Sequence, residues 1–332
     1  MTAAVEAATS ARLLAPPNPW VGACLVATDG QQFTGFTQRP GGRHAEPHVL
    51  AVARKEAGPD VAHSATLYVT LEPCSHYGRT PPCCDAIIEA GVSRVVVGVL
   101  DPDPNVAGSG IAALRDAGIK VDVGVEAAAV EQQLAPYLHH RRTGRPYVVL
   151  KLAATVDGQT AAPDGTSQWI TGEAARADAH RIRAESDAIV VGAGTVRADN
   201  PRLTARNIVA ADGTPPRSPL RVVLGRAPET AAVHPCQEMT GDLPAIVDEL
   251  GKQGIVQVMV EGGATVAASF HQAGLVDRYV VYLAPAFMGG SDGLGLFHGP
   301  GVTTLSEMER LSFAAMKQLG SDVRLDLVRL PS

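Results

Sequence analysis

The chain has 332 residues, of which 45% are hydrophobic and 19% charged, with a formal net charge of −6 and a pI near 5.9. This length is enough for two domains with separate cores, and the balanced composition excludes a disordered or fibrous protein. The acidic balance argues against nucleic-acid binding, which needs a concentrated basic face, but it leaves room for a local basic pocket that holds one small phosphorylated ligand.

The amino-terminal residues and the cysteines predict a cytoplasmic protein. Residues 1–14 contain Glu6 and Arg12 and lack the uninterrupted apolar core of a signal peptide, and no stretch approaches the length of a membrane span. No secreted disulfide framework is recognisable in the spacing of the five cysteines, which are Cys24, Cys74, Cys83, Cys84 and Cys236. Three of them fall within residues 74–84, and clustered cysteines in a reducing compartment usually bind metal.

The first half of the chain alternates predicted strands and helices. The Asp29–Gly30 pair between two alternating segments is a strong hairpin signal. Strands are predicted at residues 21–28, 31–36, 65–71, 93–100 and 119–125, and helices at 46–58, 81–91 and 109–118. This alternation predicts a mostly parallel sheet that helices cover on both faces.

A second alternating pattern follows a basic segment, residues 139–146, that is broken by Gly144 and Pro146. We therefore predict two domains, residues 1–144 and 145–332, with no internal repeat between them. The second contains predicted strands at residues 146–155, 187–192, 219–225, 255–262 and 276–285, and helices at 172–186, 245–254 and 265–274.

Two segments of the first half together have the pattern of a zinc deaminase. RHAEPH places His44 and Glu46 at the start of a helix, and TLEPCSHYGRTPPCCDA places Cys74 after a strand and Cys83 in the first turn of the next helix. Zinc deaminases combine an H-x-E element with P-C and a second cysteine, so that three ligands leave one position for water. The predicted ligands are His44, Cys74 and Cys83, and Glu46 would carry protons between the water and the departing ammonia.

The remaining cysteines have simpler interpretations. Cys84 lies off the metal-facing side of the helix and is expected to be a small buried side chain. Cys24 in a strand and Cys236 in a loop receive no role.

The second half contains one segment that suits a phosphate. VMVEGGATVAAS is a strand followed by Gly262–Gly263 and a helix start, where free amides would receive a phosphate group, although such a turn is often only a turn. VVGAGTV resembles the start of a dinucleotide fingerprint but has Arg197 in place of the third glycine and no acidic strand end about twenty residues on. A doubly wound dinucleotide fold is therefore disfavoured.

Longer motifs resemble the bifunctional riboflavin-biosynthesis deaminase–reductase family. In the first half these are PNPWVG, HAE, EPCSHYGRTPPC and DPDPNVAGSG, and in the second KLAATVDGQTA, TSQWIT, TVRADNPRLTAR, VEGGATVAASFHQAGLVD and APAFMGG. The resemblance covers nearly the whole chain. It implies an α/β protein with an amino-terminal cytidine-deaminase-like α/β/α domain and a dihydrofolate-reductase-like α/β domain.

The resemblance also implies the reactions and cofactors. The first domain would deaminate 2,5-diamino-6-(5-phosphoribosylamino)pyrimidin-4-one with zinc. The second would reduce the ribosyl group with NADPH to give 5-amino-6-(5-phosphoribitylamino)uracil. The implied partners are this phosphorylated pyrimidine and further copies of the chain, without nucleic acid or membrane. The alternatives are a zinc deaminase for another base or nucleoside with a non-catalytic second domain, and a non-catalytic binding protein.

The resemblance also implies which residues form the two active sites, from their positions in the motifs. In the first domain the positions that match substrate contacts are Asn18, His76, Arg79 and Asp101. In the second domain they are Ser167, Arg183, Leu203, Arg206 and Glu261. The positions that match NADP contacts are Ala153, Trp169, Thr195, Asp199, Gly263, Ala264, Thr265, Val266, Ala267, Ala268 and Ser269. Lys151 and Asp199 are candidates for positioning and proton supply in the reduction.

The chain departs from the family pattern at a few positions. Thr37 stands where the family often has histidine, and Asp103 where the D-P-N-P motif has asparagine, which bears on the deaminase pocket but not on the metal. Arg226 replaces a serine-like residue after the strand RVVLG. We hypothesise that Arg226 faces the 2′-phosphate of the cofactor and favours NADPH over NADH.

Overall fold

The computed structural model describes residues 1–78, 80–104 and 106–330, and its chain divides into two compact units. The first contains Met1–Thr143 together with Val209–Pro216, and the second contains Gly144–Ile208 and the chain from Arg217 onward. Each unit has its own sheet and is described by itself.

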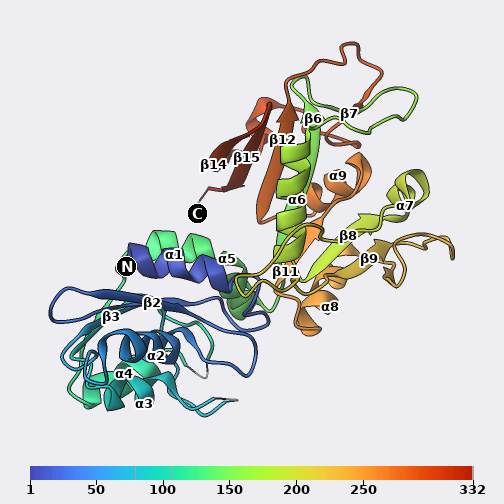
Figure 1. Ribbon diagram of the computed structural model, residues 1–332. Coiled ribbons are helices and arrows are strands. Elements are labelled where there is room, and N and C mark those ends of the chain that lie inside the picture. Colours follow the sequence, from blue (N-terminus) through green and yellow to red (C-terminus); the bar gives the residue numbers. More distant parts are fainter. Residues whose placement is uncertain (79, 105, 331–332) are drawn as a thin grey trace. The chain divides into compact units, whose positions relative to one another are not determined.

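The first unit is built on a five-stranded sheet with the order β2-β1-β3-β4-β5. Its strands are β1 (Gly22–Val26), β2 (Gln32–Phe36), β3 (Thr66–Leu71), β4 (Arg94–Val99) and β5 (Lys120–Val123). Its helices are α1 (Thr2–Ala11), α2 (Ala45–Ala57), α3 (Cys83–Glu89), α4 (Ser109–Asp116) and α5 (Ala127–Thr143). Helices α1 and α5 cover one face of the sheet, and α2, α3 and α4 cover the other (Figure 1).

The prediction of a mostly parallel sheet is wrong for this unit. Strand β1 pairs antiparallel with both β2 and β3, and only β3–β4 and β4–β5 are parallel. The Asp29–Gly30 hairpin puts β1 antiparallel to β2, and the connection through α2 then passes over β1 and brings β3 to its other side. The carboxyl ends of β3 and β4 lie at the same edge, so the segments that follow Leu71 and Val99 meet there.

The second unit is built on an eight-stranded sheet with the order β10-β9-β8-β11-β6-β12-β15-β14, in which only β12–β15 and β15–β14 are antiparallel. Its strands are β6 (Tyr147–Thr155), β8 (Ala188–Gly192), β9 (Leu220–Leu224), β10 (Gln237–Met239), β11 (Gln257–Val260), β12 (Arg278–Ala284), β14 (Leu311–Leu319) and β15 (Asp322–Arg329). Its helices are α6 (Glu173–Glu185), α7 (Ala193–Asp199), α8 (Leu243–Lys252), α9 (Ala264–Gln272) and the 3₁₀ turn η1 (Leu305–Glu307). Strands β7 (Gln159–Ala161) and β13 (Leu294–Gly295) form a separate small sheet.

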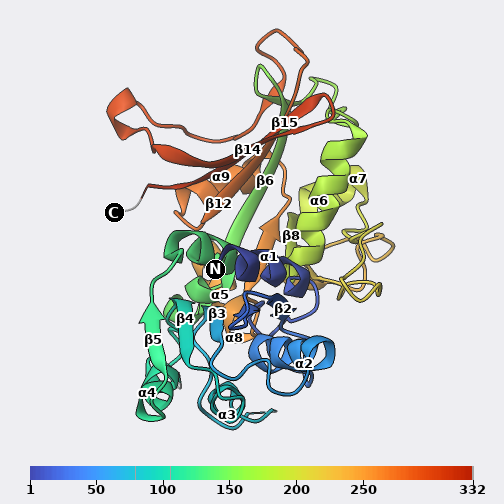
Figure 2. The ribbon, with the colours of Figure 1, turned by 60° about the vertical axis from the view of Figure 1, so that its left-hand side comes forward.

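Two hydrophobic cores lie on opposite faces of this sheet. Alternate residues of β6 contribute to them: Val148 and Leu150 pack with α8 and α9, whereas Val149 packs with α6 and α7. Figures 1 and 2 show the long helix α6 standing on its face of the sheet and the β14–β15 pair at the sheet's edge.

Several elements escaped prediction from the pattern. Helix α1 buries only the small side chains of Ala4, Ala8 and Ala11, and it lies so close to β1 that a Cβ atom on Gly22 would come 2.0 Å from the carbonyl oxygen of Ala4. Helix α5 contains Pro136, which is unfavourable inside a helix. The pattern also missed α7, the short strands β7, β10 and β13, and the hairpin of β14 and β15.

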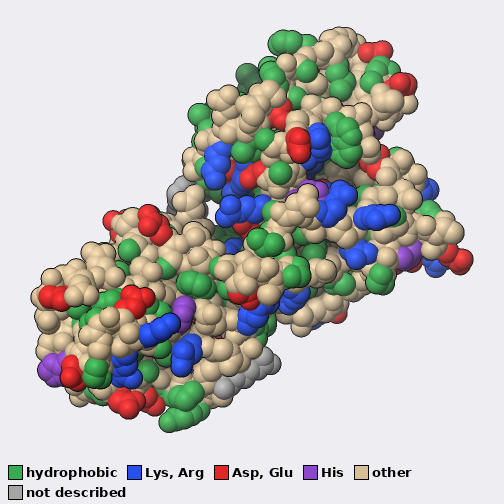
Figure 3. Space-filling model, viewed as in Figure 1, with side chains coloured by type: hydrophobic (Ala, Val, Ile, Leu, Met, Phe, Trp, Pro, Cys, Tyr) green, Lys and Arg blue, Asp and Glu red, His purple; other side chains and the backbone are tan. Residues whose placement is uncertain are grey.

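None of the described helices combines the length and apolar character needed to cross a membrane. On the face drawn in Figure 3, basic side chains are interspersed with acidic and neutral ones over both units.

Candidate active sites

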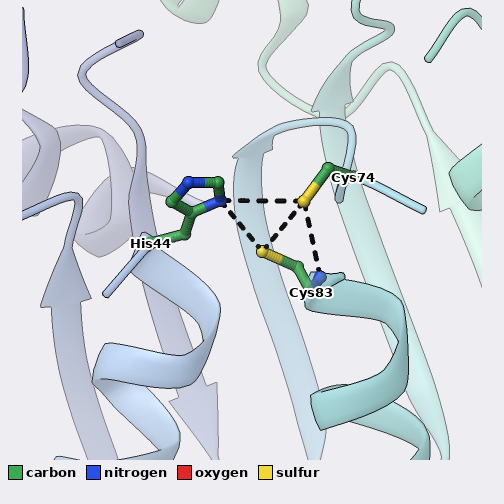
Figure 4. Close-up of side chains that lie close together, drawn as sticks. All are labelled: His44, Cys74 and Cys83. Carbon is green, nitrogen blue, oxygen red and sulfur yellow. Dashed lines mark hydrogen bonds between the residues drawn. The ribbon is translucent and has the colours of Figure 1, made fainter. Parts of the chain in front are cut away.

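Three side chains converge in the first unit at the starts of two helices. His44 is the residue that precedes α2, Cys74 follows β3, and Cys83 is the first residue of α3 (Figure 4). The Nδ1 atom of His44 lies 3.3 Å from Sγ of Cys83 and 3.7 Å from Sγ of Cys74, and the two sulfur atoms are 3.4 Å apart. Among the described residues this is the one group that could hold a metal ion.

The geometry of this group fits zinc. A tetrahedral ion with Zn–S bonds of about 2.3 Å and Zn–N bonds of about 2.0 Å keeps its ligand atoms about 3.5 to 3.8 Å apart. The observed separations are close to these values, and a set of one imidazole and two thiolates is typical of zinc. The other ring nitrogen of His44 lies 3.4 Å from Oγ1 of Thr80, a contact that helps to fix the orientation of the ring.

The local electrostatics favour a thiolate in this group. The hydrogen bond with Cys83 lowers the pKa of Cys74 to about 4, and bonds with His44 and the backbone N–H of Cys83 act in the same direction. The pKa of Cys83 is raised well above its usual value by the same sulfur contact and by burial, because the pair shares one negative charge. Thiolate is the form of cysteine that binds zinc.

Glu46 lies beside the three ligands in the first turn of α2 and is only 4% exposed. Burial raises the pKa of Glu46 to about 7, and the nearby Cys74 thiolate adds to the rise. A zinc cation beside the carboxyl group would act in the opposite direction. The side chain is thus placed next to the metal position without belonging to the ligand set.

The expected pocket residues of this unit lie in different environments. Asn18 is half-buried in the turn before β1, whereas His76 is exposed after Cys74. Asp101 is buried after β4, and its carboxylate accepts hydrogen bonds from the Tyr137 hydroxyl at 3.0 Å and from the backbone N–H of Asp103 at 2.9 Å. Arg79 lies outside the described residues.

One buried carboxylate at this edge was not predicted from the motifs. Glu72, in the same E-P-C segment as Cys74, is 4% exposed and accepts hydrogen bonds from four backbone N–H groups. The sequence did contain a signal for it, since Glu72 stands between a buried strand and a predicted metal ligand. A charged side chain in such a buried position needs several hydrogen-bond partners.

The second unit brings together three of the expected charged residues. Arg183 of α6 forms a bidentate ion pair with Glu261, with nitrogen–oxygen distances of 2.5 and 2.7 Å. Glu261 follows Val260, the β11 partner of Leu150 in β6, so Lys151 lies beside it across the parallel ladder. Burial opposes ionisation of Glu261, but the bonds and charge of Arg183 outweigh it and lower the pKa of the carboxyl group. For Lys151, burial disfavours the charged form and lowers the pKa, although the negative charge of Glu261 acts in the opposite direction.

The Gly262–Gly263 turn connects β11 to α9, and Gly262 is closely packed. A Cβ atom on Gly262 would come 2.4 Å from Cβ of Val266. The backbone N–H of Gly263 donates to Oγ1 of Thr195 in α7 at 3.2 Å. The expected cofactor residues Ala264, Thr265, Val266, Ala267, Ala268 and Ser269 all belong to α9, whose N-terminus begins after this turn.

The other expected residues of this unit are more scattered. Trp169 is 70% exposed and lies under the guanidinium group of Arg176, and Asp199 is exposed at the end of α7. Leu203 is buried with a positive φ of 49°, a backbone conformation unusual for leucine. Arg206 is exposed, with Nη2 3.5 Å from Nε2 of His180. Ser167 and Ala153 are half-buried.

Comparisons with known proteins cover both units. Residues 1–99 match the family model of the cytidine and deoxycytidylate deaminase zinc-binding region, and residues 146–325 match that of the RibD C-terminal domain. The riboflavin biosynthesis protein RibD of Escherichia coli K12 is 40% identical, over 99% of this chain and 98% of that protein. RibD of Mycobacterium tuberculosis H37Rv is 42% identical, over 94% of this chain and 91% of that protein. The chain belongs to the RibD family.

Solved structures of RibD proteins have the same fold. Acinetobacter baumannii RibD, form 1, superposes with a TM-score of 0.89 at 35% identity, over 99% of this chain and 98% of that one. The diaminohydroxyphosphoribosylaminopyrimidine deaminase/5-amino-6-(5-phosphoribosylamino)uracil reductase of Thermotoga maritima gives a TM-score of 0.86 at 34% identity, over 99% and 97% of the two chains. The predicted class, a mixed α/β protein with a deaminase domain before a reductase domain, is confirmed.

Membership in the RibD family decides between the interpretations of the sequence. The chain is an enzyme of riboflavin biosynthesis with a hydrolytic deaminase and a reductase activity, and a non-catalytic second domain is disfavoured because that half matches the RibD C-terminal domain. Its cofactors are zinc, which the group of His44, Cys74 and Cys83 fits, and NADPH.

Two departures from the RibD pattern have local explanations. The hydroxyl group of Thr37 is buried and lies within 3.5 Å of the backbone N–H and carbonyl of Val21, where it closes the end of the β1–β2 hairpin. Asp103 pairs with Arg141 of α5 at 3.6 Å, a partner that an asparagine could not hold by charge.

Proposed function

We propose that the first unit hydrolyses the 2-amino group of 2,5-diamino-6-(5-phosphoribosylamino)pyrimidin-4-one. The second would then reduce the ribosyl group of the product with NADPH to give 5-amino-6-(5-phosphoribitylamino)uracil. The observation that carries the proposal is the group of three ligand atoms with the buried Glu46 beside it. The Thermotoga maritima relative is named for the same two activities, which supports the pairing.

In the deamination, a C–O bond forms at C2 of the pyrimidine and the C–N bond to the amino group breaks. Zinc, when bound, lowers the pKa of water and so supplies a nucleophile near neutral pH. Glu46 takes the proton that the attacking water releases and delivers it to the departing nitrogen, which leaves as ammonia. Asn18 would hold the pyrimidine edge with its amide, and His76 and Arg79 would face the phosphate. Asp101 would line the pocket.

In the reduction, NADPH supplies a hydride to C1′ of the ribose in its open-chain or imine form. Lys151 would supply the proton, because it lies beside Glu261 and Arg183, whereas Asp199 is exposed at the end of α7. Two nitrogen atoms of Arg183 already donate hydrogen bonds to Glu261, so the exposed Arg206 would be the main partner of the substrate phosphate. Ser167 and Leu203 would complete the contacts to the substrate.

The cofactor would lie along the carboxyl edge of the larger sheet. The N-terminus of α9 after Gly263 would receive its phosphates, with Thr195 holding the turn. Ala153, Trp169 and Asp199 would add further contacts. Arg226 follows β9, whose partner β8 lies next to β11, so it shares this edge and would face the 2′-phosphate.

Domain limits, location and assembly are part of the proposal. We assign residues 1–144 to the deaminase domain and 145–332 to the reductase domain. The change of compact unit between Thr143 and Gly144 supports this division, apart from Val209–Pro216. Two thiolate ligands require a reducing environment, which supports a cytoplasmic location. The edge strand β14 exposes Phe313 and Met316, which would suit association of copies into a homo-oligomer.

One experiment tests both activities. The purified chain is incubated with the diaminopyrimidinone ribotide, NADPH is then added, and ammonia release and loss of NADPH absorbance are followed separately. We expect both signals in sequence. Ammonia without NADPH oxidation would contradict the reductase assignment, and neither signal would contradict the whole proposal.

A further inference from the structure

The side chain of Glu72 is a buried charge that the deamination mechanism does not use. Each of its oxygen atoms accepts two backbone hydrogen bonds. Oε2 accepts from Asp101 at 3.3 Å and Gly108 at 3.0 Å, and Oε1 accepts from Gly110 at 3.0 Å and Ile111 at 3.3 Å. A carboxylate with four N–H partners is fully occupied, so it is not available as an acid or base.

Three of these four bonds fix the start of α4, and the fourth holds the backbone of Asp101. Gly108 is the residue that precedes the helix, and α4 has no side-chain cap from its own sequence. The first amides of a helix have no partner within the helix, and a carboxylate there is also favoured by the helix dipole. Glu72 therefore caps α4 from the end of β3, more than 30 residues away in sequence.

Other contacts join the segment after β3, residues 72–75, to the first residues of α4. A Cβ atom on Gly110 would come 1.9 Å from the carbonyl oxygen of Pro73, so only glycine allows this approach. The thiol of Cys84 lies within 3.6 Å of the carbonyl oxygens of both residues. The hydroxyl groups of Ser75 and Ser109 are 2.8 Å apart. The turn that carries the zinc ligand Cys74 is thus tied to the connection between β4 and α4.

That connection contains Asp101, one of the proposed pocket residues. Its backbone N–H is bound by Glu72 and its carboxylate by the Tyr137 hydroxyl, so both the main chain and the side chain are held. We propose that Glu72 is a positioning residue of the deaminase: it holds the Asp101 segment in register with the Cys74 turn and so sets the affinity for the pyrimidine substrate. This inference rests on the proposed deaminase function.

Glutamine at position 72 is a sharp test because it changes almost no volume. Its amide has one acceptor oxygen, and its NH₂ group would face two N–H donors whichever way it is turned. Half of the four bonds are lost in either orientation, while the metal ligands keep their own contacts with α3 through the backbone N–H groups of Cys83 and Cys84.

The experiment uses the full-length chain loaded with zinc. For Glu72→Gln we expect the KM for ammonia release to rise about tenfold or more, with kcat within about threefold of the wild type, because a displaced pocket residue weakens binding before it affects the chemistry. Zinc content should stay at one per chain, and NADPH oxidation on the deaminated substrate should be unchanged. Glu72→Asp, which keeps a carboxylate but shortens the reach, should recover part of the KM.

The matched control is Thr70→Val on the same strand. Thr70 is fully buried and accepts one hydrogen bond from the backbone N–H of Gly22, away from the connection that Glu72 holds. We expect this variant to lower the melting temperature by a few degrees with an unchanged KM.

Two outcomes would overturn the inference. An unchanged KM in Glu72→Gln would show that the four bonds do not set substrate affinity. A parallel fall of kcat, zinc content and melting temperature, matched by Thr70→Val, would reduce Glu72 to a purely structural role. A wild-type chain that releases no ammonia from the substrate would instead contradict the proposed function itself.

Discussion

The two active sites of this RibD protein are constructed in contrasting ways. The proposed deaminase site takes its ligands and its proton carrier from residues 44–83, and the three candidate ligand atoms lie within 4.8 Å of one another. The proposed reductase site collects Lys151 from β6, Arg183 from α6, and Glu261 with the turn at Gly263 from the connection between β11 and α9. A metal ion needs few ligands at fixed distances, whereas a dinucleotide and a sugar phosphate need an extended surface.

The largest expected loss of activity tests the deaminase site. Replacement of Cys83 by alanine should remove zinc and lower ammonia release by at least about 10⁴-fold, because the nucleophile is no longer activated. Metal analysis and the ammonia assay give the readout, with NADPH oxidation on the deaminated substrate as the internal reference. Cys84→Ala is the control, since Cys84 is buried next in sequence but outside the ligand group. Loss of zinc from Cys84→Ala but not from Cys83→Ala would reverse the assignment.

A smaller loss of deaminase activity is expected when the zinc ligands are kept and the proposed proton carrier is replaced. Glu46→Gln should reduce kcat for deamination by about 10³-fold while zinc content stays at one per chain. The measurement is steady-state ammonia release together with metal content, and the reductase activity of the same sample should not change. Deamination within a few-fold of the wild type would rule out Glu46 as the proton carrier.

The reductase site should tolerate single substitutions better than the deaminase site. Lys151→Met is expected to lower kcat for NADPH oxidation by about 10²-fold, and Asp199→Asn by clearly less. Because burial lowers the pKa of Lys151, its protonated donor form is lost as the pH rises through a value below the usual range of lysine. The wild-type rate should therefore fall on the alkaline side, and this decline should be absent from the residual rate of Lys151→Met. A larger loss in Asp199→Asn would transfer the role to Asp199.

The smallest expected effect concerns cofactor choice. Arg226→Ala should raise the dissociation constant of NADPH about tenfold, which corresponds to one lost phosphate contact, and leave that of NADH nearly unchanged. Binding is measured directly by titration of cofactor fluorescence. Arg197→Ala, an exposed arginine in α7, serves as the comparison and should bind both cofactors normally. Equal weakening toward NADPH and NADH in Arg226→Ala would exclude contact with the 2′-phosphate.

Prediction from the sequence succeeded where the chemistry is local. The predicted strands and helices on either side of His44, Cys74 and Cys83 are present, so the pattern alone placed His44 and Cys83 at helix starts and Cys74 after a strand. It failed for α1, whose buried face consists of alanines, and for β14, whose Phe313 and Met316 are exposed. In both cases the hydrophobic pattern is weak because the segment is stabilised by close backbone approach or by its neighbours in the sheet.

The sequence by itself predicted the three residues of the candidate metal group, the order of the domains and the family, because these depend on residue types at short, fixed spacings. Only the tertiary structure decided that β1 lies between β2 and β3, that Glu72 caps a helix far along the chain, and that Arg183 is engaged by Glu261. The Glu72–Gly108 and Arg183–Glu261 contacts join residues that are 36 and 78 positions apart, and they involve backbone groups or single charges that leave no periodic signal. Their pairing follows from strand order and burial, which are properties of the folded chain as a whole.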